Sequence, residues 1–169
     1  MKSKLTFRSL FVLASLISFF MLGFAYFLEY ALNIEPCPLC LLQRYLLWVV
    51  FVSLTIGTIH NGKKTACLLY CITTCFFSLI GIILAARHVW LQYLAPPEFA
   101  NCSAGLERML LFKPLLEVLK DVLLYSSPEC SRIDFTFLKL SLPIWSLLSF
   151  TGFAVFGVFV GWLKTKRRI

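Results

Sequence analysis

Residues 65–86 read TACLLYCITTCFFSLIGIILAA and contain no charged side chain. A run of this length can cross a hydrocarbon layer of roughly 30 Å, which takes about 20 helical residues. Its apolar residues form a continuous block, whereas a lipid-embedded barrel strand would alternate apolar and polar residues. The stretch therefore predicts a transmembrane helix.

Three similar blocks occupy residues 9–28, 41–59 and 143–163, and the only charge in any of the four is Arg44. The chain of 169 residues is 60% hydrophobic and 14% charged, whereas about a quarter of the residues of a soluble domain are charged. The first block has a basic start, but it is too long for a signal-peptide core and no small-residue cleavage site follows it. The sequence predicts an all-α integral membrane protein, a single domain over residues 1–169 built as a bundle of four transmembrane helices.

Basic residues concentrate in three short segments that define the predicted topology. The net charge is +8, and residues 1–8, 60–64 and 164–168 carry basic side chains without an acidic one. Cytoplasmic segments of membrane proteins are enriched in Lys and Arg. Both termini and the turn at 60–64 are therefore predicted to be cytoplasmic, and loops 29–40 and 87–142 to be external. Because topology explains the positive charge, no nucleic-acid partner is predicted.

The long external loop contains a second kind of helical pattern at residues 105–125. Its leucines and valines recur on one side at helical spacing, and its charged residues fall elsewhere. The segment is too polar to span the membrane, so we predict an amphipathic helix in the interface plane. A helix packed within a small external domain is the alternative.

Residues 35–45 read EPCPLCLLQRY and place Cys37 and Cys40 at the external start of the second block. A Cys-x-x-Cys ring closes almost no loop entropy, so it is a poor structural staple, and such pairs often stabilise a thiolate. A zinc or copper site would need further ligands, and the chain contains neither a second Cys-x-x-Cys nor a histidine pair. The motif favours redox chemistry over a metal site, and no metal ligands are predicted.

Two further residues, Arg44 and His88, are candidates for a pocket around Cys37 and Cys40. Arg44 lies four residues after Cys40, on the same face of a helix, where it would lower the pKa of Cys40 together with the helix N-terminus. Snorkelling of Arg44 to the headgroups is the alternative. His88 closes the third helix on the same external side, where it either reaches this pocket or is solvated at the interface.

The remaining cysteines form two groups. Cys102 and Cys130 flank the amphipathic segment in the external loop, where a disulfide is either a structural staple or a partner in thiol exchange. Cys67, Cys71 and Cys75 recur at every fourth position of the third block. Small polarisable residues let helices approach closely in membranes, so this stripe is predicted to be a packing surface.

Taken together, these motifs resemble the DsbB family of disulfide bond formation proteins, the quinone-coupled thiol oxidases of the bacterial inner membrane. The resemblance covers nearly the whole chain. Its specific features are CPLCLLQR at 37–44, the histidine after the third block, PPEFANC at 96–102, and CSRIDFTFLKLSLPIWSL at 130–147. The cysteine stripe of the third block is not part of the family pattern.

The resemblance implies a relay of disulfide exchange in the periplasm. Cys102 would form a mixed disulfide with a reduced periplasmic oxidase of the DsbA type, which has a thioredoxin fold. Cys130, once released, would exchange with Cys37, and Cys40 would face the electron acceptor.

It also implies the cofactor, a membrane quinone such as ubiquinone or menaquinone, with Arg44 and His88 near its ring. The chain lacks a glycine-rich nucleotide fingerprint, which agrees with a small lipid-soluble acceptor. The expected function is thus a protein dithiol:quinone oxidoreductase. A disulfide-stapled membrane scaffold and a metal or solute carrier are the alternatives.

Overall fold

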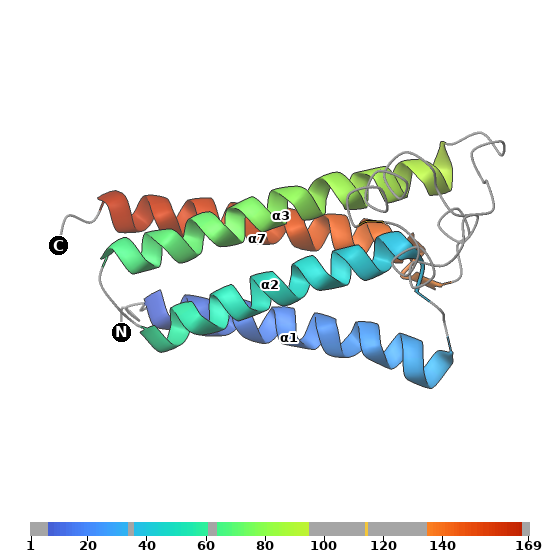
Figure 1. The fold of residues 1–169 in the computed structure, drawn as a ribbon, viewed down its shortest axis with the longest axis horizontal. Coiled ribbons are helices and arrows are strands. Elements are labelled where there is room, and N and C mark those ends of the chain that lie inside the picture. The colour runs from blue at the N-terminus through green and yellow to red at the C-terminus, as the bar shows by residue number, and fades with distance from the viewer. Residues whose placement is uncertain (1–6, 34–35, 61–63, 95–113, 115–134, 167–169) are drawn as a thin grey trace.

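The computed structural model describes residues 7–33, 36–60, 64–94, 114 and 135–166, which form four long helices and one small hairpin (Figure 1). Helix α1 spans Phe7–Leu32, α2 Pro38–His60, α3 Lys64–Tyr93 and α7 Leu142–Lys166. Each contains one predicted block and continues beyond it, and all four are long and apolar enough to cross a membrane. The predicted all-α membrane bundle of four helices is confirmed.

The four helices run side by side and alternate in direction (Figure 1). The start of α1, the end of α2, the start of α3 and the end of α7 therefore lie at one end of the bundle. Arg8, Lys164 and Lys166 belong to this end. The segments predicted to be external connect to helix ends at the other end of the bundle. The amphipathic segment 105–125, Cys102 and Cys130 lie outside the described residues.

Helix α1 packs against α2, α2 against α3, and α3 most extensively against α7. The cysteine stripe of α3 contributes to this last interface. A Cβ added at Gly157 of α7 would lie 3.0 Å from the carbonyl oxygen of Cys71 and 3.4 Å from Cβ of Cys75. A Cβ at Gly161 would lie 3.7 Å from Cβ of Cys71. Two glycines and a row of small thiols thus bring the backbones together, as the packing interpretation predicted.

Hydroxyl groups join neighbouring helices inside the apolar bundle. Ser15 of α1 and Thr55 of α2 are hydrogen-bonded at 2.8 Å, and Ser53 of α2 and Thr73 of α3 at 2.8 Å. Such pairs contribute about 0.6 kcal/mol on average in a membrane, so they fix helix register more than they stabilise the fold.

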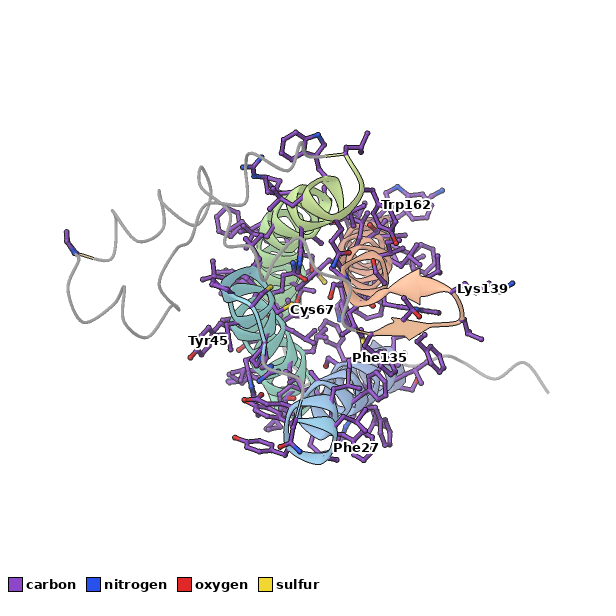
Figure 2. The ribbon with its side chains drawn as sticks, turned by 90° about the vertical axis from the view of Figure 1, so that its right-hand side faces the viewer. Phe27, Tyr45, Cys67, Phe135, Lys139 and Trp162 are labelled. Carbon is purple, nitrogen blue, oxygen red and sulfur yellow. The ribbon has the colours of Figure 1, made fainter. Side chains whose placement is uncertain are left out.

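Aromatic side chains cover the outside of the bundle. Phe27, Tyr45 and Trp162 point outward (Figure 2) and are 56%, 64% and 55% exposed. Such a surface is unfavourable in water and suits a lipid solvent, as expected for a membrane protein.

A β-hairpin precedes α7 and was not part of the predicted all-α fold. Strand β1, Thr136–Phe137, pairs antiparallel with β2, Leu140–Ser141. The two turn residues, Leu138 and Lys139, have φ of 52° and 66°. The indole Nε1 of Trp145 on α7 donates a hydrogen bond to the carbonyl of Phe137 at 3.1 Å, so the hairpin is tied to the helix.

Candidate active site

A cavity of about 580 Å³ lies at the end of the bundle where α2 and α7 begin, bounded by α1, α2, α3, α7 and the hairpin. Most of its wall is apolar or aromatic, and the few polar side chains come mainly from α2, α3 and α7. Phe20 and Phe24 of α1 line the cavity and are 69% and 43% exposed. The cavity is therefore open to the surroundings of the bundle beside α1.

Cys37 and Cys40 line the cavity at the start of α2. Pro38 occupies the first turn, where its missing N–H and fixed φ suit a helix start. Cys37 caps the helix: its carbonyl accepts from Leu41 N at 3.1 Å and its Sγ accepts from Cys40 N at 3.4 Å. A backbone N–H at the N-terminus of α2 thus contacts the sulfur of Cys37. From the sequence, the helix N-terminus was expected to act on the sulfur of Cys40 instead. Both cysteines are free thiols.

His88 of α3 contacts both thiols. Its Nε2 lies 3.7 Å from Sγ of Cys37, and its Nδ1 lies 4.0 Å from Sγ of Cys40. The imidazole is 2% exposed. Of the two interpretations of this histidine, the structure supports the one that places it in the pocket with the cysteine pair.

Gln43 is a buried polar residue that the sequence analysis did not single out. Its amide Nε2 lies 3.4 Å from Nδ1 of His88, and the side chain is 5% exposed. An amide nitrogen donates, so this contact favours the tautomer in which Nδ1 accepts and the proton of the neutral imidazole lies on Nε2. That proton faces Cys37.

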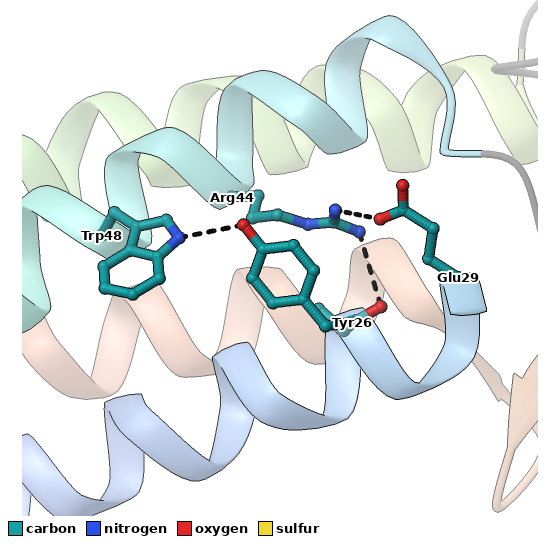
Figure 3. Close-up of polar contacts among 5 residues, drawn as sticks. Tyr26, Glu29, Arg44 and Trp48 are labelled. Carbon is teal, nitrogen blue, oxygen red and sulfur yellow. Dashed lines mark hydrogen bonds and ion pairs between the residues drawn. The ribbon is translucent and has the colours of Figure 1, made fainter. Parts of the chain in front are cut away.

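Arg44 is held by the last two turns of α1 (Figure 3). Its guanidinium forms an ion pair with Glu29 and donates to the carbonyl of Ala25 at 3.4 Å. The cation also lies over the ring of Tyr26, 4.6 Å from its centroid, and the hydroxyl of that ring accepts from Trp48 Nε1 at 3.3 Å. The Arg44 side chain is 13% exposed, so its guanidinium is anchored within the bundle.

The cavity wall includes Arg44 and Glu29 as well as the thiols, although the described contacts of Arg44 run to α1 rather than to Cys40. The structure thus brings together four predicted residues: Cys37, Cys40, Arg44 and His88. The other two, Cys102 and Cys130, lie outside the described residues.

Gln43 and Glu29 were not among the residues predicted from the sequence, and only Gln43 carried a usable signal. It is a polar residue inside an apolar block, three positions after Cys40 and therefore on the same helical face. Glu29 follows the last residue of the first predicted block, where an acidic residue is ordinary.

Comparison with known proteins gives a consistent family assignment. Residues 7–160 match the family model described as disulfide bond formation protein DsbB. A disulfide bond formation protein B of Hahella chejuensis is 36% identical over 99% of this chain and 100% of its own length. Those of Acinetobacter baumannii and Acinetobacter baylyi are 41% and 40% identical, over 83% and 84% of this chain and 81% of their own lengths. The chain is therefore a multi-pass membrane protein that belongs to the DsbB family of disulfide bond formation proteins.

Proposed function

We propose that this protein reoxidises a soluble DsbA-type dithiol protein of the periplasm and passes the electrons to a membrane quinone. The observation that carries the proposal is the cavity. It places the thiols of Cys37 and Cys40 against a largely apolar space of about 580 Å³ that is open beside α1, a helix apolar enough to span a membrane. Pockets of about 300–1,000 Å³ with apolar walls and a few polar groups are typical of sites for small organic ligands.

The residues around the cavity fit a quinone. The aromatic side chains of α1, the hairpin and α7 offer surfaces for a flat ring and an isoprenoid chain, and Phe20, Phe24 and Trp145 are examples. The polar groups for the ring oxygens are Arg44 and His88, which line the same space. A bound quinone would supply an acceptor for two electrons and two protons.

The side chains of the site then have distinct roles. Closing the Cys37–Cys40 disulfide removes two electrons and two protons from the dithiol. Nδ1 of His88 is the accepting nitrogen nearest to Cys40, so it can take up the proton of that thiol. Its Nε2–H faces Cys37 and can stabilise negative charge on that sulfur during exchange. Arg44, ion-paired with Glu29, supplies guanidinium N–H donors beside the cavity.

The relay toward the partner rests on the family resemblance. Cys102 would receive electrons from the partner's dithiol and Cys130 would pass them to the Cys37–Cys40 disulfide by thiolate attack. The protein would lie in the bacterial inner membrane with both termini in the cytoplasm. Arg8, Lys164 and Lys166 support this orientation, because they belong to the end of the bundle opposite the thiols.

Quinone reduction by the purified protein in detergent tests the proposal, with a reduced DsbA-type protein as electron donor. The ultraviolet absorbance of the quinone reports turnover. Cys37→Ser, Cys40→Ser, Cys102→Ser and Cys130→Ser are each expected to abolish it, whereas Cys75→Ser, at the α3–α7 interface, retains it. Folded protein that reduces neither ubiquinone nor menaquinone would contradict the proposal and favour a disulfide-stapled scaffold.

A further inference from the structure

Three potential metal ligands meet at the cavity: Cys37, Cys40 and His88. One ligand atom from each lies within 4.8 Å of the other two. Cys37 and His88 are buried and Cys40 is partly buried. Thiolate sulfur and imidazole nitrogen are the ligands that Zn²⁺ prefers, and the cysteine pair alone supplies only two of them. The fold adds the third from α3, 48 residues further along the chain.

We propose that the dithiol state of this protein binds one divalent cation of the Zn²⁺ class at Cys37, Cys40 and His88. Three protein ligands leave the fourth tetrahedral position open, as in zinc sites that hold water or a small ligand. Here the open position faces the cavity, which has room for a water molecule or an exogenous ligand. Modest movement of the side chains brings the three atoms to coordination distance.

The surroundings of His88 suit a ligating imidazole. A histidine that binds metal through one nitrogen usually hydrogen-bonds through the other. Nε2 is the nitrogen beside Cys37, which leaves Nδ1 for Gln43 at 3.4 Å. Rotation of the Gln43 amide about its terminal bond presents its oxygen to an Nδ1–H. The backbone N–H of Cys40 already donates to the sulfur of Cys37 and would support it as a ligand.

The charges also balance. Two thiolates and one divalent cation form a neutral complex, which an apolar cavity accepts more readily than a separate ion. The nearest described cation on α2, Arg44, is neutralised by its ion pair with Glu29. The site therefore gains no net charge when the metal binds.

Metal binding at this site depends on the redox state. The dithiol binds the cation and releases two protons, with no transfer of electrons, because only deprotonated sulfur is a ligand. The Cys37–Cys40 disulfide has no thiolate and leaves His88 as the sole ligand of the three. The cation thus captures the reduced pair and must leave before the disulfide can close. Metal binding itself needs neither quinone nor partner protein. Only its consequence, inhibition of quinone reduction by the bound cation, rests on the proposed function.

Titration of the full-length protein with Co²⁺ in detergent tests the site, after reduction with a phosphine. Thiolate-to-cobalt absorption bands in the near ultraviolet and tetrahedral bands in the visible are expected at one ion per chain, and none in the oxidised protein. Cys40→Ser is expected to remove most of the thiolate band, and Cys75→Ser to leave it unchanged. His88→Ala is expected to weaken binding by at least about 10-fold, whereas His60→Ala leaves it unchanged.

A second measurement uses the unmodified chain, in case a variant fails to fold. Zn²⁺ is expected to slow alkylation of Cys37 and Cys40 by a maleimide, and not that of Cys75, as mapped by mass spectrometry. The proposal is overturned by equal cobalt bands in the oxidised protein, or by unchanged affinity in a folded His88→Ala variant. Equal rates of alkylation of Cys37 and Cys40 with and without zinc would also overturn the proposal. Because these readouts do not involve turnover, failure of quinone reduction leaves them interpretable.

Discussion

The imidazole of His88 faces the sulfurs of both Cys37 and Cys40, with Nε2 3.7 Å from the first and Nδ1 4.0 Å from the second. One ring thus faces both members of the cysteine pair through different nitrogens. This arrangement lets α3 influence the chemistry of two residues that belong to the start of α2.

Replacement of His88 tests its proposed role as the proton acceptor of the cysteine pair. His88→Ala is expected to slow oxidation of the reduced cysteines by quinone by about 100-fold, since a positioned acid–base group contributes about 10²–10⁴-fold. Single-turnover measurement of quinone absorbance reports this rate without the partner protein. His60→Ala is the matched control, because His60 is the other histidine of the chain and lies at the opposite end of α2. An unchanged rate in His88→Ala would remove His88 from the chemistry.

Gln43 is expected to determine which nitrogen of His88 carries the proton. In the neutral ring Nδ1 should be unprotonated, since the amide of Gln43 donates to it. Nitrogen NMR of protein labelled at histidine distinguishes the two tautomers, and the chain has only two histidines to assign. Gln43→Leu should weaken the preference, and Gln43→Glu should reverse it because a carboxylate accepts rather than donates. A protonated Nδ1 in the unmodified protein would contradict the assignment.

Arg44 is expected to contribute to quinone affinity. Arg44→Ala should raise the apparent KM for quinone about 10-fold, as expected for loss of one hydrogen bond from a charged group, and leave partner binding largely intact. The anchoring of Arg44 to α1 suggests the control: Glu29→Gln removes the ion pair and keeps the cation. Steady-state kinetics at varied quinone concentration measure both variants. An equal rise of KM in Glu29→Gln would assign the effect to contact between α1 and α2 instead.

The membrane spans could be predicted because bilayer thickness imposes one length scale on every uninterrupted apolar block. The Cys37–Cys40 pair and Arg44 were recognisable for a similar reason, since their spacing along one helix decides which face they share. The position of His88 beside both thiols depends instead on how α3 packs against α2. The sequence spacing did not decide whether His88 reaches the cysteine pair, and only the tertiary structure places its ring.

Two further features had no local signal strong enough to predict them. The ion pair of Glu29 with Arg44 joins α1 to α2, and neither residue specifies the other in the sequence. The hairpin before α7 turns through Leu138 and Lys139, although two-residue turns with positive φ usually contain Gly, Asn or Asp. The contact of Trp145 with Phe137 helps to hold this turn, which is a tertiary effect.

Gly81 of α3 provides a test of the α3–α7 interface. A Cβ at this position would lie 2.5–2.7 Å from three atoms of the Phe150 ring, a buried side chain that also lines the cavity. Because that ring must move, Gly81→Ala should lower the free energy of unfolding by about 1–3 kcal/mol, the range for overpacking a well-packed core. Equilibrium unfolding in mixed detergent, followed by circular dichroism, measures the change. Gly152→Ala is the matched control, since nothing lies within 4 Å of its added Cβ, and it should be neutral or slightly stabilising. If Gly81→Ala and Gly152→Ala have the same free energy of unfolding, the Phe150 ring can adopt another rotamer, and its close contact with Gly81 does not limit helix packing.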